Sequence, residues 1–132
     1  MATVRIAWKG GEVTADLRDS PTVNQLLAAL PCKASANTWG EEVYFEVPIK
    51  AGLEAEARQV VEPGTVCFWV QGCSLALPFG PTPVSKGEEC RLFTACNVLG
   101  RIRGDPRQLQ TVRQGAAIRV ELLPEAKSGA RD

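Results

Sequence analysis

The feature that most constrains this chain is a series of short segments in which apolar and polar residues alternate, each bounded by glycine or proline. In residues 3–8, Val4, Ile6 and Trp8 share one face. A period of two is typical of a β-strand with one buried face. Gly10 and Gly11 follow, and glycine suits the positive φ values of a tight turn. The alternation then resumes over residues 12–17, so we predict a β-hairpin.

Six further segments have strand character, and two short helices are predicted among them. The strands are expected at residues 42–48, 59–61, 65–70, 73–79, 91–99 and 117–123. One helix is predicted to start at Ser20-Pro21 and the other at Asp105-Pro106, because a capping side chain precedes a proline in both places. Many short strands separated by turns predict a sandwich or a closed barrel, and only a barrel leaves no exposed edge.

Length and charge limit the possible classes of protein. The chain has 132 residues, which suits a single domain over residues 1–123 with a small, polar tail over 124–132 that we expect to fray. Fifteen basic residues balance fifteen acidic ones, which argues against a nucleic-acid partner. No apolar run approaches the ~18 residues of a membrane span, and no export signal is visible. We therefore expect a cytoplasmic protein with no membrane partner.

Cysteine and histidine usage bears on the chemistry. The five cysteines are odd in number and form no Cys-x-x-Cys pair, so we expect reduced and mostly buried thiols. Histidine is absent, which removes the commonest general base and the commonest metal ligand. We therefore assign no metal site, no cofactor and no catalytic residue.

Three segments, in this order, carry a family resemblance. They are Thr-Trp-Gly-Glu-Glu-Val-Tyr-Phe at residues 38–45, Phe-Gly-Pro-Thr-Pro at 79–83 and Asn-Val-Leu-Gly-Arg at 97–101. Together they resemble a group of small prokaryotic cyclophilin-like proteins of uncharacterised function, over residues 2–123. The resemblance implies a mainly β fold: a closed, eight-stranded antiparallel cyclophilin-like barrel with two short helices.

The resemblance implies less about the function than about the fold. Cyclophilins isomerise X–Pro bonds with an arginine beside a hydrophobic proline pocket, in a strand that reads Phe-His-Arg-Val. The corresponding strand here is Val-Tyr-Phe-Glu-Val at residues 43–47, which holds neither arginine nor histidine. No counterpart of the cyclophilin Gln-Gly-Gly run is found either. The resemblance therefore implies a retained apolar pocket, with Phe79 as its aromatic floor, and lost catalytic electrostatics.

The aromatic residues suggest where a ligand would bind. Tyr44 and Trp69 lie on the faces of their strands opposite to the aliphatic residues, where the outside of a barrel needs no large ring. We predict one shared groove, and its candidate ligand-binding residues are Trp39, Glu42, Tyr44, Trp69, Phe79, Pro81 and Arg101. The alternative, in which these rings only fill the core, remains open at this point.

Three functions are compatible with the sequence. The first is a cyclophilin-like domain that binds a peptide segment or small apolar ligand in a barrel-side groove without strong catalysis. The second is an active peptidyl-prolyl isomerase with a non-standard site, in which Arg101 would polarise the prolyl amide. The third is a homodimeric interaction domain that uses the aromatic face. The chain could accordingly be a monomer or a homodimer.

Overall fold

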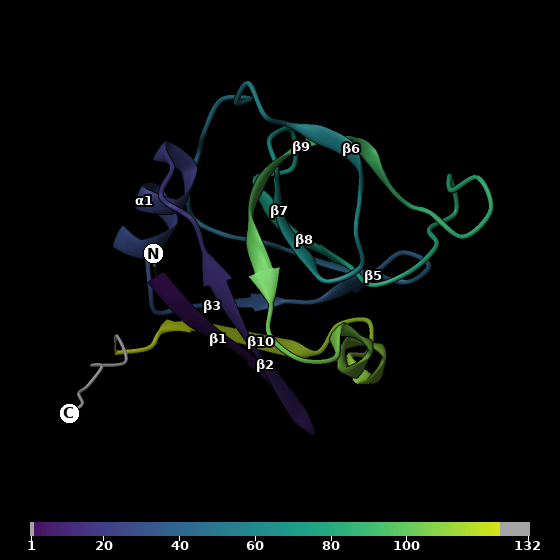
Figure 1. Ribbon diagram of the computed structural model, residues 1–132. Coiled ribbons are helices and arrows are strands. Elements are labelled where there is room, and N and C mark those ends of the chain that lie inside the picture. Colours follow the sequence, from purple (N-terminus) through teal and green to yellow (C-terminus); the bar gives the residue numbers. More distant parts are fainter. Residues whose placement is uncertain (1, 125–132) are drawn as a thin grey trace.

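The computed structural model describes residues 2–124 and shows an antiparallel sheet that curls into a nearly closed barrel (Figure 1). Neighbouring strands follow the order β3-β10-β1-β2-β9-β7-β8-β5-β4, and β6 pairs with β9 outside this path. The strands are β1 (Ala2–Trp8), β2 (Gly11–Leu17), β3 (Cys32–Ser35), β4 (Asn37–Thr38), β5 (Glu42–Glu46), β6 (Arg58–Val61), β7 (Thr65–Trp69), β8 (Ser74–Pro78), β9 (Cys90–Ile102) and β10 (Ala117–Leu122).

The predicted mainly β, cyclophilin-like barrel with two helices is confirmed, and all eight predicted strands are found at their expected places. The structure adds two very short strands, β3 and β4. They pair with β10 and β5 respectively, at the two ends of the strand order. The partner of β3 is far away in the sequence, and β4 has only two residues, so local alternation gave no sign of either strand. The predicted polar tail lies outside the described residues, apart from Pro124.

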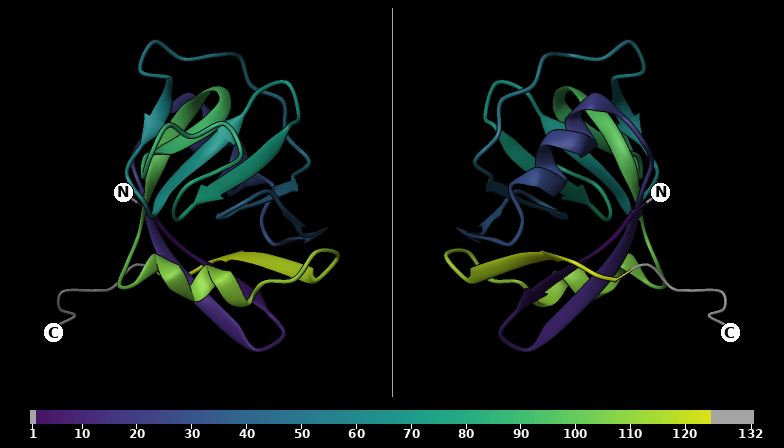
Figure 2. Two further views of the ribbon diagram at one scale, coloured as in Figure 1. Left: turned by 90° about the vertical axis from the view of Figure 1, so that its right-hand side faces the viewer. Right: turned by 90° about the vertical axis from the view of Figure 1, so that its left-hand side faces the viewer.

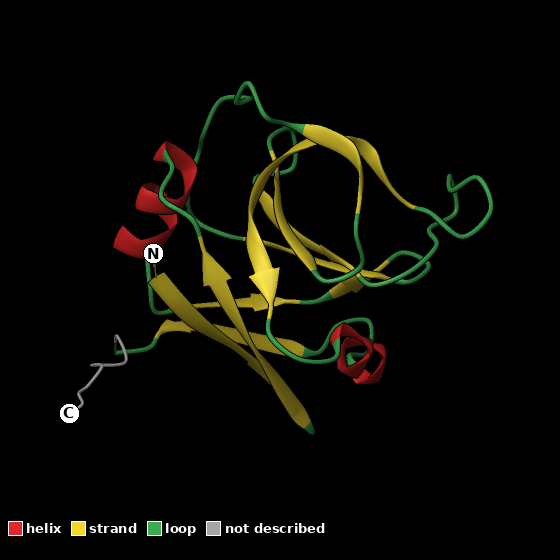
Figure 3. Cartoon of the chain, viewed as in Figure 1, coloured by secondary structure: helices red, strands yellow, loops and turns green. Residues whose placement is uncertain are grey.

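Both helices begin at a side-chain cap, as predicted, and they lie on opposite sides of the barrel (Figure 3). The hydroxyl of Ser20 accepts a hydrogen bond of 3.1 Å from the Val23 amide at the start of α1 (Pro21–Ala28). The Asp105 carboxylate accepts one of 2.9 Å from the Arg107 amide at the start of the 3-10 helix η1 (Pro106–Thr111). Each cap satisfies a backbone donor that has no partner within its own helix.

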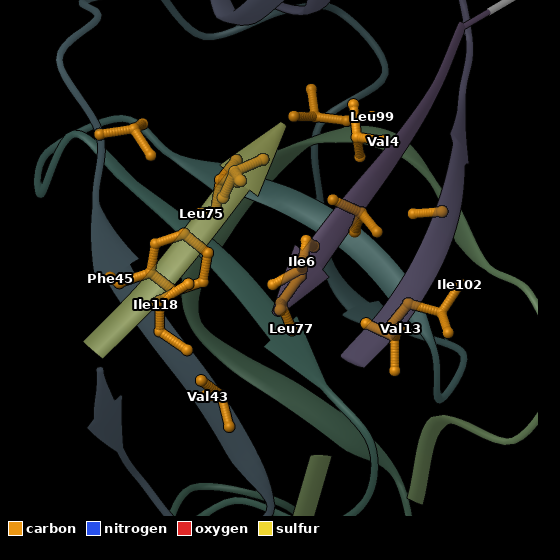
Figure 4. Packing of buried hydrophobic residues seen from close by; sticks show 14 of the residues in the cluster. Val4, Ile6, Val13, Val43, Phe45, Leu75, Leu77, Leu99, Ile102 and Ile118 are labelled. Carbon is orange, nitrogen blue, oxygen red and sulfur yellow. The ribbon is translucent and has the colours of Figure 1, made fainter. Parts of the chain in front are cut away.

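The barrel interior is filled by the apolar side chains that alternate inward along the strands (Figure 4). Ile6, Phe45, Phe68, Leu75 and Leu77 are all at most 1% exposed. Side chains from both sides of the barrel therefore meet in one packed centre. Burial of this apolar surface is the main favourable contribution to folding.

Strand β9 has two roles along its length. Residues 97–102 pair with β7 and β2 inside the barrel wall, whereas residues 90–96 leave the wall and pair with β6 (Figure 1). Where β9 crosses β2, a Cβ atom on Gly100 would collide with the Asp16 carbonyl oxygen. Glycine is therefore required for the close approach of these two strands. The two views of Figure 2 show the extension of β9 and β6 rising from one side of the barrel.

A buried amide holds the long connection between β5 and β6 against the barrel. The side-chain nitrogen of Asn97 donates to the Thr22 hydroxyl at 3.0 Å and to the Gly52 carbonyl at 2.9 Å. Its side-chain oxygen accepts a hydrogen bond of 2.7 Å from the Glu54 amide. Asn97 has no exposed surface, and these bonds offset the loss of its contacts with water. The asparagine of the third family-like segment thus ties helix α1, this connection and β9 together.

We expect Phe68→Ala to lower the free energy of unfolding by about 3–5 kcal/mol, because it opens a cavity in the closed barrel centre. Phe93→Ala removes the same ring from a side chain that is 66% exposed, and it should change stability far less. Urea denaturation of both variants measures the difference. Equal losses would contradict the assignment of Phe68 to the interior.

Candidate functional site: an aromatic cavity on the outer wall

The wall formed by β7, β8 and β5 carries buried side chains on both of its faces. Every residue of β8 is buried, although alternate side chains point to opposite sides of the strand. On the outer side, strand pairing aligns Tyr44, Ala76, Cys67 and Val98 in one row across four strands. These residues belong to a second apolar cluster, separate from the barrel interior. The outer face of this wall therefore needs a cover of its own.

The cover comes from β6 and the first half of β9. Val61, Cys90, Leu92 and Cys96 from these strands are buried against the outer wall. They close the cluster incompletely and leave a cavity of about 190 Å³. Its lining consists of Trp39, Glu42, Tyr44, Trp69, Ala76, Leu92, Phe93 and Cys96. We call this space the aromatic cavity.

Four aromatic rings form the walls of the aromatic cavity and contact one another in series. The Trp39 and Phe93 rings have centroids 6.2 Å apart, those of Phe93 and Trp69 are 6.1 Å apart, and those of Trp69 and Tyr44 are 6.0 Å apart. The interplanar angles are 78°, 74° and 87° in the same order. Edge-to-face contacts of this type are favourable, and successive rings stand nearly at right angles. The rings thus enclose a space on several sides.

Local backbone geometry places two of these rings. Trp39 lies in the turn between β4 and β5, where its amide donates to the Glu42 carbonyl at 3.0 Å, so the turn brings residues 39 and 42 opposite each other. Trp69 ends β7, and its ring lies against Gly72 in the loop that leads to β8. A Cβ atom on Gly72 would collide with the indole ring. Gly72 therefore permits the observed position of Trp69.

Two polar atoms at the cavity are buried without a partner. Glu42 is only 5% exposed, and its Oε1 atom accepts no hydrogen bond. The indole Nε1 of Trp69 is likewise buried without an acceptor. Burial raises the pKa of Glu42 to about 7, because the charged form loses hydration in this apolar setting. The aromatic cavity thus combines apolar walls with a titratable carboxyl group and a free N–H donor.

The thiols in the same cluster provide no positive charge that could pair with Glu42. Burial is the main cause of the raised pKa values of Cys67, Cys90 and Cys96, and the nearby charge of Glu42 raises each of them further. The pKa of Cys90 is raised to about 11 and that of Cys96 to about 12. All five cysteines of the chain are free thiols. Within residues 2–124, no cationic side chain forms an ion pair with Glu42.

The structure brings together four of the seven predicted site residues: Trp39, Glu42, Tyr44 and Trp69 all line the aromatic cavity. Tyr44 and Trp69 do point away from the barrel interior, as their positions opposite the aliphatic residues predicted.

The other three predicted residues lie elsewhere, which corrects the predicted groove. Phe79 is 6% exposed and packs in the barrel interior, because it continues the inward row of Leu75 and Leu77. Pro81 is half-buried, and its carbonyl accepts a hydrogen bond of 2.9 Å from the Glu41 amide outside the cavity. Arg101 is exposed beside Thr65 and lines a different hollow of the surface.

Sequence reasoning did not select Ala76, Leu92, Phe93 and Cys96 for the site. Ala76 could have been found, since it shares the outer face of β8 opposite Tyr44 and Cys67. The three β9 residues reach the cavity only because the first half of this strand leaves the wall, and no local pattern signals that bend.

Comparison with known proteins identifies the class of protein. A family model described as Cyclophilin-like matches residues 2–121, so the chain belongs to the cyclophilin-like family, as its three motif segments indicated. The solution structure of the hypothetical protein AF2241 from Archaeoglobus fulgidus is similar, with a TM-score of 0.80 and 35% sequence identity. The alignment covers 92% of this chain and 95% of that one. No curated protein matches the chain.

Residues 2–124 include no helix that is both long and apolar enough to cross a membrane. The same residues contain no group of three or more Cys, Asp or Glu side chains placed to hold a metal ion.

The raised pKa of Glu42 should make stability depend on pH. The Glu42 carboxyl has a pKa of about 4.3 in the unfolded chain and about 7 in the folded chain, so the folded state binds the proton more tightly. Stability from this group is complete at low pH and is lost as pH rises through 7. Between pH 5 and pH 8 the free energy of unfolding of the native chain should fall by about 2–3 kcal/mol more than that of Glu42→Gln. Chemical denaturation at both pH values measures this.

Glu46→Gln is the matched control for that comparison, because Glu46 is an exposed carboxylate on the same strand and the same outer face. Its pH dependence should follow that of the native chain. If Glu42→Gln and Glu46→Gln behave alike, the carboxyl of Glu42 is solvated and not buried.

Proposed function

We propose that this protein binds a small apolar ligand, or the side chain of a peptide segment, in the aromatic cavity without strong catalysis. The observation that carries the proposal is the cavity itself, with its four rings and a buried, unpartnered carboxyl group. Ligand sites in proteins are commonly concave, mostly apolar and equipped with a few polar groups. A core built for stability alone would fill this space with side chains, because empty volume weakens packing.

The charged groups at the cavity support binding more than prolyl isomerisation. The resemblance to cyclophilins implies an arginine beside the proline pocket, and no arginine is among the lining residues. Arg101, the candidate substitute, is on a different hollow. The two lining groups with strongly perturbed pKa values, Glu42 and Cys96, are neutral or anionic, so neither would donate a cationic hydrogen bond to a prolyl amide.

The setting of the protein is also a proposal. Cys67, Cys90 and Cys96 are free and buried within the cluster below the cavity. Persistent free thiols suit a reducing compartment, so we place the protein in the cytoplasm, without a nucleic-acid or membrane partner.

Binding at the cavity should be visible in the indole N–H signals of the three tryptophans. We expect small neutral alcohols such as 3,3-dimethyl-1-butanol to shift the signals of Trp39 and Trp69 in heteronuclear NMR spectra. Trp8 supplies an internal control, because its indole nitrogen donates to the Thr111 hydroxyl at 2.9 Å and does not line the cavity. Shifts of all three signals, or of none across a panel of apolar probes, would contradict the proposal.

A standard prolyl isomerase assay should show little or no rate gain. Uncatalysed exchange of an X–Pro bond takes tens of seconds or longer, so catalysis is easily detected. An ordinary cyclophilin run in parallel is the positive control. Turnover comparable to that control would establish the alternative of an active isomerase and overturn the non-catalytic reading.

Self-association through the aromatic face is a second candidate, favoured by one observation. Phe93 is 66% exposed and contacts the rings of Trp39 and Trp69, so the three rings form a contiguous apolar patch that a second copy of the chain could cover. Sedimentation of the native chain and of Phe93→Ala distinguishes the cases: a dimer that becomes a monomer on this substitution supports the interaction domain.

A further inference from the structure

We infer that the aromatic cavity selects a small organic cation, an ammonium group that carries alkyl substituents, with the Glu42 carboxylate as its counter-ion. This inference rests on the proposed ligand-binding function and specifies the chemical class of the ligand. Three features of the cavity carry it: an unpaired buried carboxyl group, a set of enclosing rings, and the charge of the surrounding groups.

The first feature is that Glu42 lacks a counter-ion. It is 5% exposed, and its Oε1 atom accepts no hydrogen bond from the described residues. A buried carboxylate is normally paired, because isolation from water disfavours its charge. A cation that enters the cavity would supply the missing partner. A neutral apolar ligand would leave Glu42 unpaired and would bury it further.

The second feature is the arrangement of the rings. Trp39, Phe93, Trp69 and Tyr44 are in consecutive edge-to-face contact at 74–87°. The faces of aromatic rings attract cations, and tryptophan is the strongest in this respect. Rings that meet nearly at right angles can contact an alkylated ammonium group from several sides. The alkyl groups would also bury apolar surface against Leu92 and Ala76 in the lining, which a metal ion could not do.

The third feature is the set of titratable groups that face Glu42. Tyr44 lies on the same strand, Cys67 on β7, and Cys90 and Cys96 on β9. None of these groups is cationic in any protonation state, so they do not compete with a ligand cation for the carboxylate. Burial keeps the three thiols protonated near neutral pH, which leaves Glu42 as the group that titrates between pH 6 and pH 8.

The buried indole N–H of Trp69 adds one requirement for the ligand. It has no acceptor within the described chain. A hydroxyl or carbonyl oxygen near the ammonium group would satisfy it. Choline has this combination of an alkylated ammonium group and a hydroxyl, so it is a suitable probe, whether or not the natural ligand is related to it.

The test compares choline with 3,3-dimethyl-1-butanol, which has the same shape but carries carbon in place of the charged nitrogen. Both probes are titrated into the native chain at pH 8 and constant ionic strength, with the Trp39 and Trp69 indole signals as the readout. We expect choline to bind about tenfold more tightly or better, from the cation–π and charge contributions together. The preference should decrease at pH 6, where Glu42 is mostly protonated.

Variants separate the charge from the shape of the cavity. In Glu42→Gln the affinity ratio of the two probes should fall well below the native ratio but stay above one, because the carboxylate is lost while the aromatic rings remain. Glu46→Gln, on the same face of β5, should keep the native ratio. Phe93→Leu removes an exposed ring but keeps apolar bulk, and it should lower the preference for choline in part. Circular dichroism and thermal unfolding confirm that each variant is folded.

The outcomes distinguish this inference from the function on which it rests. Equal affinity of the native chain for both probes, or tighter binding of the alcohol, would overturn the cation selectivity and leave the ligand-binding proposal standing. A choline preference that is undiminished in Glu42→Gln would overturn the counter-ion role of Glu42. If neither probe shifts the two indole signals, the inference and the proposed function fail together.

Discussion

The arrangement of this protein depends on a barrel wall that buries side chains on both of its faces. Strand β8 is buried along its whole length, and its neighbours β7 and β5 contribute both to the barrel interior and to the outer cluster. The outer face of most antiparallel sheets can be solvated, but this one must be covered. The first half of β9 and strand β6 provide that cover, which is why β9 is much longer than the other strands.

The aromatic cavity exists because small and large side chains meet between the outer wall and the strands β6 and β9 that cover it. Its base contains the small side chains of Ala76 and Cys96, while the large rings stand around its edge. Small residues under rigid rings leave space that the rings cannot enter without losing their mutual contacts. Glu42 faces that space from β5 and has no partner there. A structure selected only for packing would replace this residue with an apolar one, because an unpaired buried carboxyl group weakens the fold at neutral pH.

Much of the barrel could be predicted from the sequence, because its strands carry their own alternation and its helices their own caps. Ser20 and Asp105 both act as caps in the structure as the sequence indicated. Strand β3 was not predicted because it pairs with β10, which is distant along the chain, and β4 was not predicted because two residues are too few to show an alternation. The outward direction of Tyr44 and Trp69 was predictable from their neighbours. The same alternation places Phe79 inside with Leu75 and Leu77, whereas the family resemblance had suggested Phe79 as the floor of the pocket.

The central claim is that Glu42 is an unpaired carboxyl group in an apolar cavity that accepts a cation. The most direct measurement is the pKa of its side-chain carboxyl, followed by ¹³C NMR titration with and without saturating choline. The free protein should show a value of about 7, from burial, and choline should lower it because the cation stabilises the carboxylate. A value near ~4.3 in the free protein, as in an exposed glutamate, or a value that choline leaves unchanged, would contradict the claim.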